Sequence, residues 1–246
     1  TMGREAWSSS EVWPPEDVRN DTLMLTSSAG LRRGRARSRQ HPDTLAIDYT
    51  LGTGPAAGWN SLTGTYRPPG GRIRYPDRSA QDDRSLIYRT PPLEEPYEVT
   101  GHPIVDLQVS IPTVDGHIFV YLEQVAPDGT AQYITEGQLR LVHRAVGEDP
   151  RGATVGPYHS YHLDDMERMP PNEPQRVTFE LIPTSWEVPA GHAIQLRITG
   201  ADADHFSLPD VRPDELRIHH APQTPSILVL PHRSAEDVAQ DQAAGQ

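Results

Sequence analysis

The 246-residue chain contains no cysteine and no lysine. The lack of cysteine excludes disulfides, thiol nucleophiles and cysteine-ligated metals. The lack of lysine excludes a Schiff-base mechanism and a serine–lysine catalytic pair within this chain. All 22 basic residues are therefore arginines. Aromatic residues are also sparse, at 7% of the chain, which disfavours an extended aromatic binding surface.

Positive charge is scarce, because the 22 arginines oppose 34 acidic residues and leave a net charge of −12. Nucleic-acid binding needs a basic surface, so we expect no nucleic-acid partner. Five arginines gather within residues 29–39, and in so acidic a chain we interpret them as a solvated hairpin tip. No apolar run reaches membrane-span length, and the first residues do not resemble a signal peptide. We therefore expect no membrane contact and a cytoplasmic location.

Long helices are disfavoured by 25 prolines and 19 glycines, which suit short strands joined by turns. The clearest pattern, in residues 103–144, predicts three strands and two turns. Apolar residues alternate from Ile104 to Ile111 and again from His117 to Val125. A Pro-Asp-Gly turn at residues 127–129 then leads into the third strand. Strands joined by tight turns are antiparallel neighbours.

Further short strands are predicted at residues 21–27, 45–49, 85–89, 177–181, 193–199 and 227–230, and another is expected to end at His219 and His220. About eight to ten strands at this spacing predict an all-β fold, a jelly-roll β-sandwich of the galactose-binding-domain type. It would have two antiparallel sheets and long loops. Its core should contain Ile118, Val120, Leu122, Leu139, Leu141, Phe179, Leu196 and Ile198.

Composition divides the chain into three parts. Residues 1–30 form a connecting segment, in which Trp7, Trp13 and the prolines 14 and 15 indicate anchors that pin it to a surface. Residues 31–233 form the sandwich. Residues 234–246 are polar and rich in Ala, Gln and Asp, which predicts a flexible C-terminal tail.

Motifs for chemistry within the chain are weak. It has neither the G-x-S-x-G of a serine hydrolase nor the H-E-x-x-H of a zinc protease. A glycine pattern at residues 52–58 departs from the nucleotide-binding motif and opens no helix. Two groups could hold a metal: His159 and His162 with Asp164 and Asp165, and Asp202 and Asp204 with His205. In the first group polar surface residues are the favoured interpretation; for the second a structural ion stays open. We assign no catalytic residue, metal ligand or cofactor.

Several segments together resemble the C-terminal domain of the X-Pro dipeptidyl-peptidase and cocaine esterase family of serine hydrolases. They are MG at 2–3, WPP at 13–15, LIY at 86–88, EVTG at 98–101, YLEQVAPDG at 121–129, TEGQLR at 135–140, HR at 143–144, LIPTS at 181–185, AGH at 190–192, PS at 225–226 and LP at 230–231. They run in order across almost the whole chain. Ala193 stands where family members have arginine, and residues 200–206 depart from the cocaine-esterase-like pattern.

The resemblance implies a jelly roll attached to an α/β-hydrolase domain that carries the catalytic Ser, Asp and His. None of these residues falls within this chain, so His143 and His192 are not triad members and the chain alone should be inactive. The implied partners are the catalytic domain of the same protein and, through it, a small ester or peptide. The family has an apolar strand before Met2, so residues 1–30 are expected to continue from a catalytic domain. A homo-oligomer stays open.

A loop between strands, residues 52–64, offers one route to function. Trp59 and Leu62 lie there without alternating apolar partners. In the resembled family the jelly roll packs on the catalytic domain, so we hypothesise that Trp59 and Leu62 line the rim of its substrate pocket. The alternative is that Trp59 only staples the loop to its own sandwich. For the whole chain, the alternative function is a free-standing jelly-roll module that binds carbohydrate.

Overall fold

The computed structural model describes residues 1–34, 41–54, 75–234 and 238. Thirteen strands lie within these ranges: β1 (Arg19–Thr26), β2 (Gly30–Arg32), β3 (Asp43–Ala46), β4 (Leu86–Arg89), β5 (Tyr97–Gly101), β6 (Ile104–Ser110), β7 (His117–Val125), β8 (Ala131–Arg140), β9 (Gln175–Glu180), β10 (Thr184–Val188), β11 (Ala193–Thr199), β12 (Glu215–His219) and β13 (Ile227–Arg233). Three short 3-10 helices are η2 (Ser79–Arg84), η3 (Leu141–His143) and η4 (Leu163–Asp165). In the described ranges no helix is long and apolar enough to cross a membrane.

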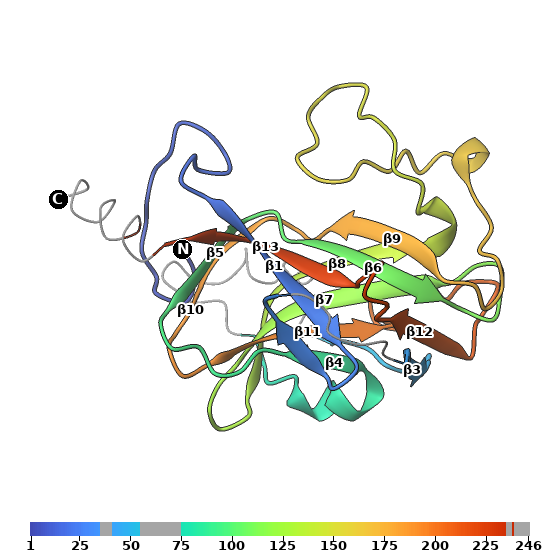
Figure 1. Cartoon of the computed structure of the whole chain (residues 1–246), viewed down its shortest axis with the longest axis horizontal. Helices are drawn as coiled ribbons and strands as arrows, with labels where there is room; N and C mark the ends of the chain where they lie inside the picture. Colours follow the sequence, from blue (N-terminus) through green and yellow to red (C-terminus); the bar gives the residue numbers. More distant parts are fainter. Residues whose placement is uncertain (35–40, 55–74, 235–237, 239–246) are drawn as a thin grey trace.

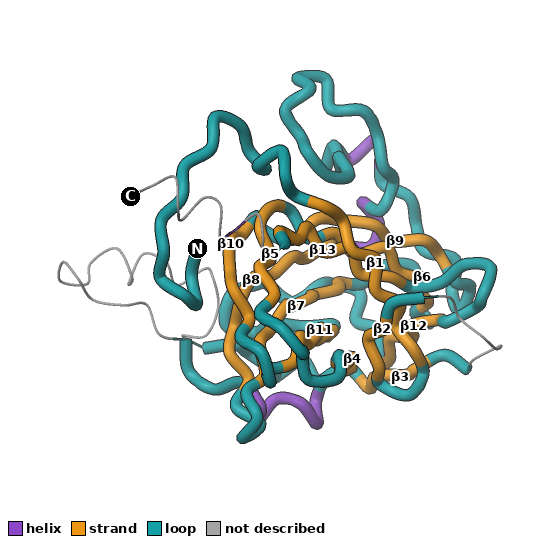
Figure 2. The backbone as a smooth tube through the Cα atoms, turned by 60° about the vertical axis from the view of Figure 1, so that its left-hand side comes forward, coloured by secondary structure: helices purple, strands orange, loops and turns teal. Residues whose placement is uncertain are grey.

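The strands build two layers that face each other across an apolar core (Figures 1 and 2). One layer contains β9, β6, β13 and β1, with β12 and β3 beside β6. The other contains β4, β11, β7 and β8 in that order. Described strand pairs are antiparallel except β2 with β4, whose single parallel bridge joins Gly30 to Arg89 and links the layers. This confirms the predicted all-β sandwich, with its two sheets connected along one edge.

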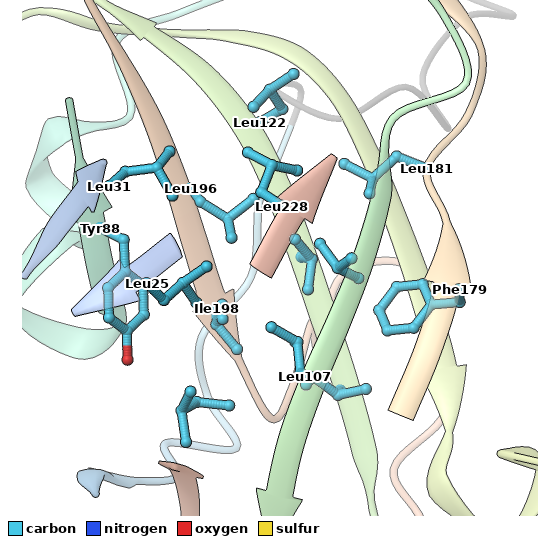
Figure 3. Packing of buried hydrophobic residues seen from close by; sticks show 14 of the residues in the cluster. Leu25, Leu31, Tyr88, Leu107, Leu122, Phe179, Leu181, Leu196, Ile198 and Leu228 are labelled. Carbon is cyan, nitrogen blue, oxygen red and sulfur yellow. The ribbon is translucent and has the colours of Figure 1, made fainter. Parts of the chain in front are cut away.

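The core lies where the inward faces of the layers meet (Figure 3). Leu196 of β11 is paired with Leu122 of β7 on one side and with Tyr88 of β4 on the other. Leu107 and Leu228 approach from the opposite layer. All eight core residues predicted from the sequence are buried, which confirms the inward face chosen for each strand.

Strand boundaries differ from the predicted ones where the apolar alternation breaks. The third central strand was expected to reach residue 144, but β8 ends at Arg140 and η3 follows. Leu141 and Val142 of η3 are both buried. No strand was predicted at β2, whereas the strand expected to end at His219 and His220 corresponds to β12, which ends at His219. In the arginine cluster, Arg32 ends β2 and Arg33 pairs with Asp21; residues 35–40 lie outside the described ranges.

The position of Leu196 predicts a large effect of truncation. Leu196→Ala should lower the free energy of unfolding by about 2–5 kcal/mol, because it removes a fully buried side chain and leaves a cavity. Urea denaturation measures this loss. Leu208→Ala, at an exposed leucine, is the matched control and should change stability by less than about 0.5 kcal/mol. A loss below about 1 kcal/mol for Leu196→Ala would contradict its central position.

Candidate functional site

The metal-ligand candidates do not converge on an ion site. Within the described ranges, no group of three or more His, Asp or Glu side chains is arranged to hold a metal. His159 is buried, and its ring nitrogens lie 2.8 and 2.9 Å from the carbonyl oxygens of His143 and Thr178. Asp202 accepts hydrogen bonds from the hydroxyls of Thr53 and Tyr121. These side chains therefore hold loops against the sheet.

A serine and a histidine do approach each other in the sandwich. Ser110 Oγ lies 2.8 Å from His219 Nε2, and Ser110 is fully buried. A nucleophile must reach its substrate, and this hydroxyl has no exposed surface. His192, at the Gly191 turn, accepts a hydrogen bond from the Gln124 side chain at 3.0 Å. This contact fastens the Gly191 turn to β7.

The densest group of buried charge lies on the outer face of β7 and β11, away from the core. Glu123 and Arg197 are both 0% exposed, with Arg197 Nε 3.0 Å from Glu123 Oε1. Arg78 Nε approaches the same oxygen to 3.2 Å. Gln195 donates to the other carboxylate oxygen at 2.7 Å, and Arg197 Nη2 reaches Asp82 at 2.6 Å. We call these five residues the ionic platform. Its two carboxylates balance the charges of its two arginines.

The ionic platform holds the segment 75–85 over the sheet. Arg78 and Asp82 come from this segment, whereas Glu123, Gln195 and Arg197 come from the strands. The Arg78 guanidinium also lies 4.2 Å from the centre of the Tyr121 ring, a cation–π contact. Asp77 accepts hydrogen bonds from the amides of Ser79 and Ala131, which lower the pKa of its carboxyl group. The segment is therefore fixed by charge at several points.

Residues 53 and 54 are anchored on the same outer face. The Thr53 hydroxyl donates to Asp202 at 2.7 Å, and the Gly54 amide donates to Asp204 at 2.7 Å. Gln81 donates to the Gly52 carbonyl at 3.0 Å, which ties residue 52 to the segment 75–85. The proposed rim residues Trp59 and Leu62 follow residue 54 in the sequence and are outside the described ranges. Their role stays a prediction.

A different surface is built by the first residues of the chain. Met2 pairs with Trp186 at the free edge of β10, donating to the Ser185 carbonyl and accepting from the Glu187 amide, both at 2.9 Å. Arg4 lies 2.8 Å from Glu98, which is buried. Farther along, Asp17 pairs with the buried Arg233 at 2.9 Å. Both ends of this segment are thus held against β5, β10 and β13.

Between these fixed ends the segment exposes tryptophan. Trp13 is half exposed, and its ring nitrogen donates to His102 at 3.1 Å. Trp7 is 99% exposed. The prediction that both tryptophans pin the segment holds for Trp13 but is wrong for Trp7 within this domain. A tryptophan left in water forgoes up to a few kcal/mol of burial free energy.

Comparison with known proteins now defines the family. Residues 1–229 match the family described as the X-Pro dipeptidyl-peptidase C-terminal non-catalytic domain. The chain belongs to this family.

The relatives are much longer proteins. A predicted serine esterase of Mycobacterium bovis is 40% identical over 225 residues, which cover 89% of this chain and 35% of the relative. The cocaine esterase of a Rhodococcus species is 26% identical over 94% of this chain and 40% of its own. An aminopeptidase structure from a Thaumarchaeota archaeon shares the fold, with a TM-score of 0.71 at 20% identity over 95% of this chain and 40% of that one. The chain thus spans about a third to two fifths of these proteins.

The ionic platform predicts a strong dependence on Arg197. Arg197→Met should cost about 3–5 kcal/mol of unfolding free energy, because it leaves the buried Glu123 carboxylate without one of its charge partners. Chemical denaturation measures the loss. Arg176→Met, which breaks the exposed pair with Asp106, is the control and should cost at most about 1 kcal/mol. Similar losses for the two variants would show that burial does not increase the contribution of the platform's ion pairs to the free energy of unfolding.

Two half-buried histidines predict a stability that falls in mild acid. Burial lowers the pKa values of His117 and His219, so the unfolded chain binds more protons than the folded chain below about pH 6.5. The free energy of unfolding should be retained above about pH 6.5 and should decrease as the pH falls below it. His117→Gln should reduce the decrease measured by urea denaturation. An unchanged decrease in this variant would assign the effect to other groups.

Proposed function

We propose that this chain is the C-terminal accessory domain of a larger serine hydrolase that cleaves small esters. It packs on an α/β-hydrolase catalytic domain of the same protein and helps to shape the substrate pocket. The observation that carries the proposal is the 40% identity to a predicted serine esterase, of which this chain covers only 35%. The relative from Rhodococcus is also named as an esterase. Cleavage of X-Pro peptides, which the family description suggests, is the second candidate.

Physical support for a partner domain comes from the exposed apolar surface. Trp7 stands in water at the middle of a segment whose two ends are fixed by buried ion pairs. The alternative, a free-standing carbohydrate module, is not favoured. Such a module would carry a row of aromatics on a sheet face, but the described exposed aromatics are Trp7, Trp13 and Tyr161, which lie outside the strands. The cytoplasmic location and a homo-oligomeric state stay predictions.

The direct test uses the whole protein encoded by the gene. It should hydrolyse p-nitrophenyl acetate, and a serine-directed phosphonate should abolish this activity. Turnover of an X-Pro-anilide in place of the ester would shift the substrate class to peptides. Absence of both activities from the folded whole protein would contradict the proposed function.

The isolated chain should hydrolyse neither substrate. The described serine beside a histidine, Ser110, is fully buried. The measurement is release of p-nitrophenol and p-nitroaniline by the folded chain, compared with its Ser110→Ala variant. Turnover that disappears in Ser110→Ala would show that this domain has its own catalytic site.

The rim hypothesis predicts a change in substrate preference. In the whole enzyme, Trp59→Ala should alter kcat/KM selectively among acyl esters of different size, because the indole would contact the acyl or leaving group. Leu62→Ala should shift the preference in the same direction. A lower melting temperature with unchanged relative kcat/KM values would support the staple alternative instead.

A further inference from the structure

One histidine attaches the loop of residues 144–166 to the sandwich. This loop rises beyond β9 (Figure 1), and within it His159 is only 7% exposed. Nδ1 of its ring lies 2.8 Å from the carbonyl oxygen of His143 and 3.1 Å from that of Ala145. On the other side of the ring, Nε2 lies 2.9 Å from the carbonyl oxygen of Thr178 in β9. The ring thus bridges the start of the loop and the sheet.

The partners of the His159 ring fix its protonation state. All three are carbonyl oxygens, which accept hydrogen bonds but cannot donate them. A neutral imidazole has a single N–H, so its bare nitrogen would oppose an oxygen lone pair at hydrogen-bond distance with no proton between them. The imidazolium form has an N–H on both nitrogens and donates in both directions. We infer that His159 is held as a buried imidazolium and acts as a proton-dependent clasp between the loop of residues 144–166 and β9.

The neighbouring titratable rings leave the positive charge on His159. On the side of η3, burial lowers the pKa of His143, and the charges of Arg140 and His159 act in the same direction, so His143 is neutral at neutral pH. Within the loop, the Tyr161 ring lies 6.0 Å from the His159 ring. Burial, and after it the charge of Glu180, raises the Tyr161 pKa, so this phenol is neutral as well.

Two carboxylates of the sheet lie beside the residue that the clasp binds. The Thr178 hydroxyl donates to Asp106 at 2.9 Å, and Asp106 forms an ion pair with Arg176. Glu180, two residues along β9, lies against the loop, since a Cβ built on Gly156 would be only 2.5 Å from Glu180 Oε2. The charge of Asp106 is therefore balanced by an arginine, whereas Glu180 adds negative charge on the side of the loop. A negative charge nearby favours the protonated form of a histidine.

Loss of the His159 proton opens the clasp. An imidazole with one N–H keeps only one side of the bridge, so the ring releases either β9 or the start of the loop. The folded chain binds this proton more tightly than an unfolded chain does, so the clasp is closed at low pH and opens as the pH rises. Opening detaches one loop and leaves the two layers in place. The turn at Asp149 also persists, because hydrogen bonds, that of the Thr154 hydroxyl foremost, hold the Asp149 pKa well below its usual range.

Nitrogen-15 NMR of the histidine rings in the folded wild-type protein tests the protonation state directly. The measurement is made at about pH 7.5, about one unit above the ordinary histidine pKa. Both ring nitrogens of His159 should carry protons at this pH. His162, which is exposed on the same loop, is the internal control and should be mostly neutral, with one bare nitrogen. A bare nitrogen on His159 under these conditions overturns the inference.

Amide hydrogen exchange gives an independent readout of the clasp. The Gly147 amide donates to the Tyr158 carbonyl oxygen at 3.0 Å, next to His159. His159→Gln has a nitrogen on one side of its carboxamide only, so at about pH 6 its Gly147 amide should exchange about fivefold faster than in the wild type. At about pH 9, where the wild-type clasp is open, the ratio of the two rates should approach one. His162→Gln is the matched control, with a ratio near one at both pH values. The same ratio for His159→Gln at both pH values would show that the attachment does not depend on a proton.

Discussion

A carboxylate that is fully buried needs positively charged or hydrogen-bonding partners beside it. Glu123 is such a carboxylate, and its partners determine how the outer face of β7 and β11 is covered. Arg197 supplies one positive charge from the neighbouring strand, and Arg78 brings the other on the segment 75–85. Because Arg78 must reach Glu123, that segment covers the outer face of β7 and β11. The sheet is consequently buried on both faces at this point, by a core on one side and by its own charged loops on the other.

The inward face was predictable from sequence because it follows a local rule. Ile118, Val120 and Leu122 alternate within one strand, so the core could be assigned without knowing the partners of that strand. For the residues on the outward face of the same strands, the sequence pattern predicts exposure to solvent. Nothing local marks Glu123 as buried, since Arg197 lies 74 residues away. The apolar alternation also did not predict the strand β2, which has only three residues. Nor did it predict the η3 turn that follows β8 after Arg140.

The exposed apolar side chains were harder to predict for a related reason. Trp7 and Trp13 were identified as anchors, but sequence cannot tell whether a tryptophan is buried in its own domain or in a neighbour. Tyr161 and Leu163 are isolated apolar residues in a polar loop, where neither strand nor helix periodicity applies. In the sequence, the histidines and aspartates around these two residues were instead considered as metal ligands. Only the three-dimensional arrangement shows that His159 fastens the loop to carbonyl groups.

The two sides of the sandwich are covered by loops in different ways. On the outer face of β7 and β11, charged residues of the chain's own loops cover the sheet, and Phe119, Tyr121 and Tyr133 are buried beneath them. On the side of β9, the ion pairs and hydrogen bonds lie at the bases of the loops, and the apolar side chains are left outside. Charge thus fixes the backbone of both sides, but among the described residues the second side presents most of the exposed large apolar side chains. A partner that covers it gains hydrophobic burial without having to order the loops, which is the condition for stable packing between domains.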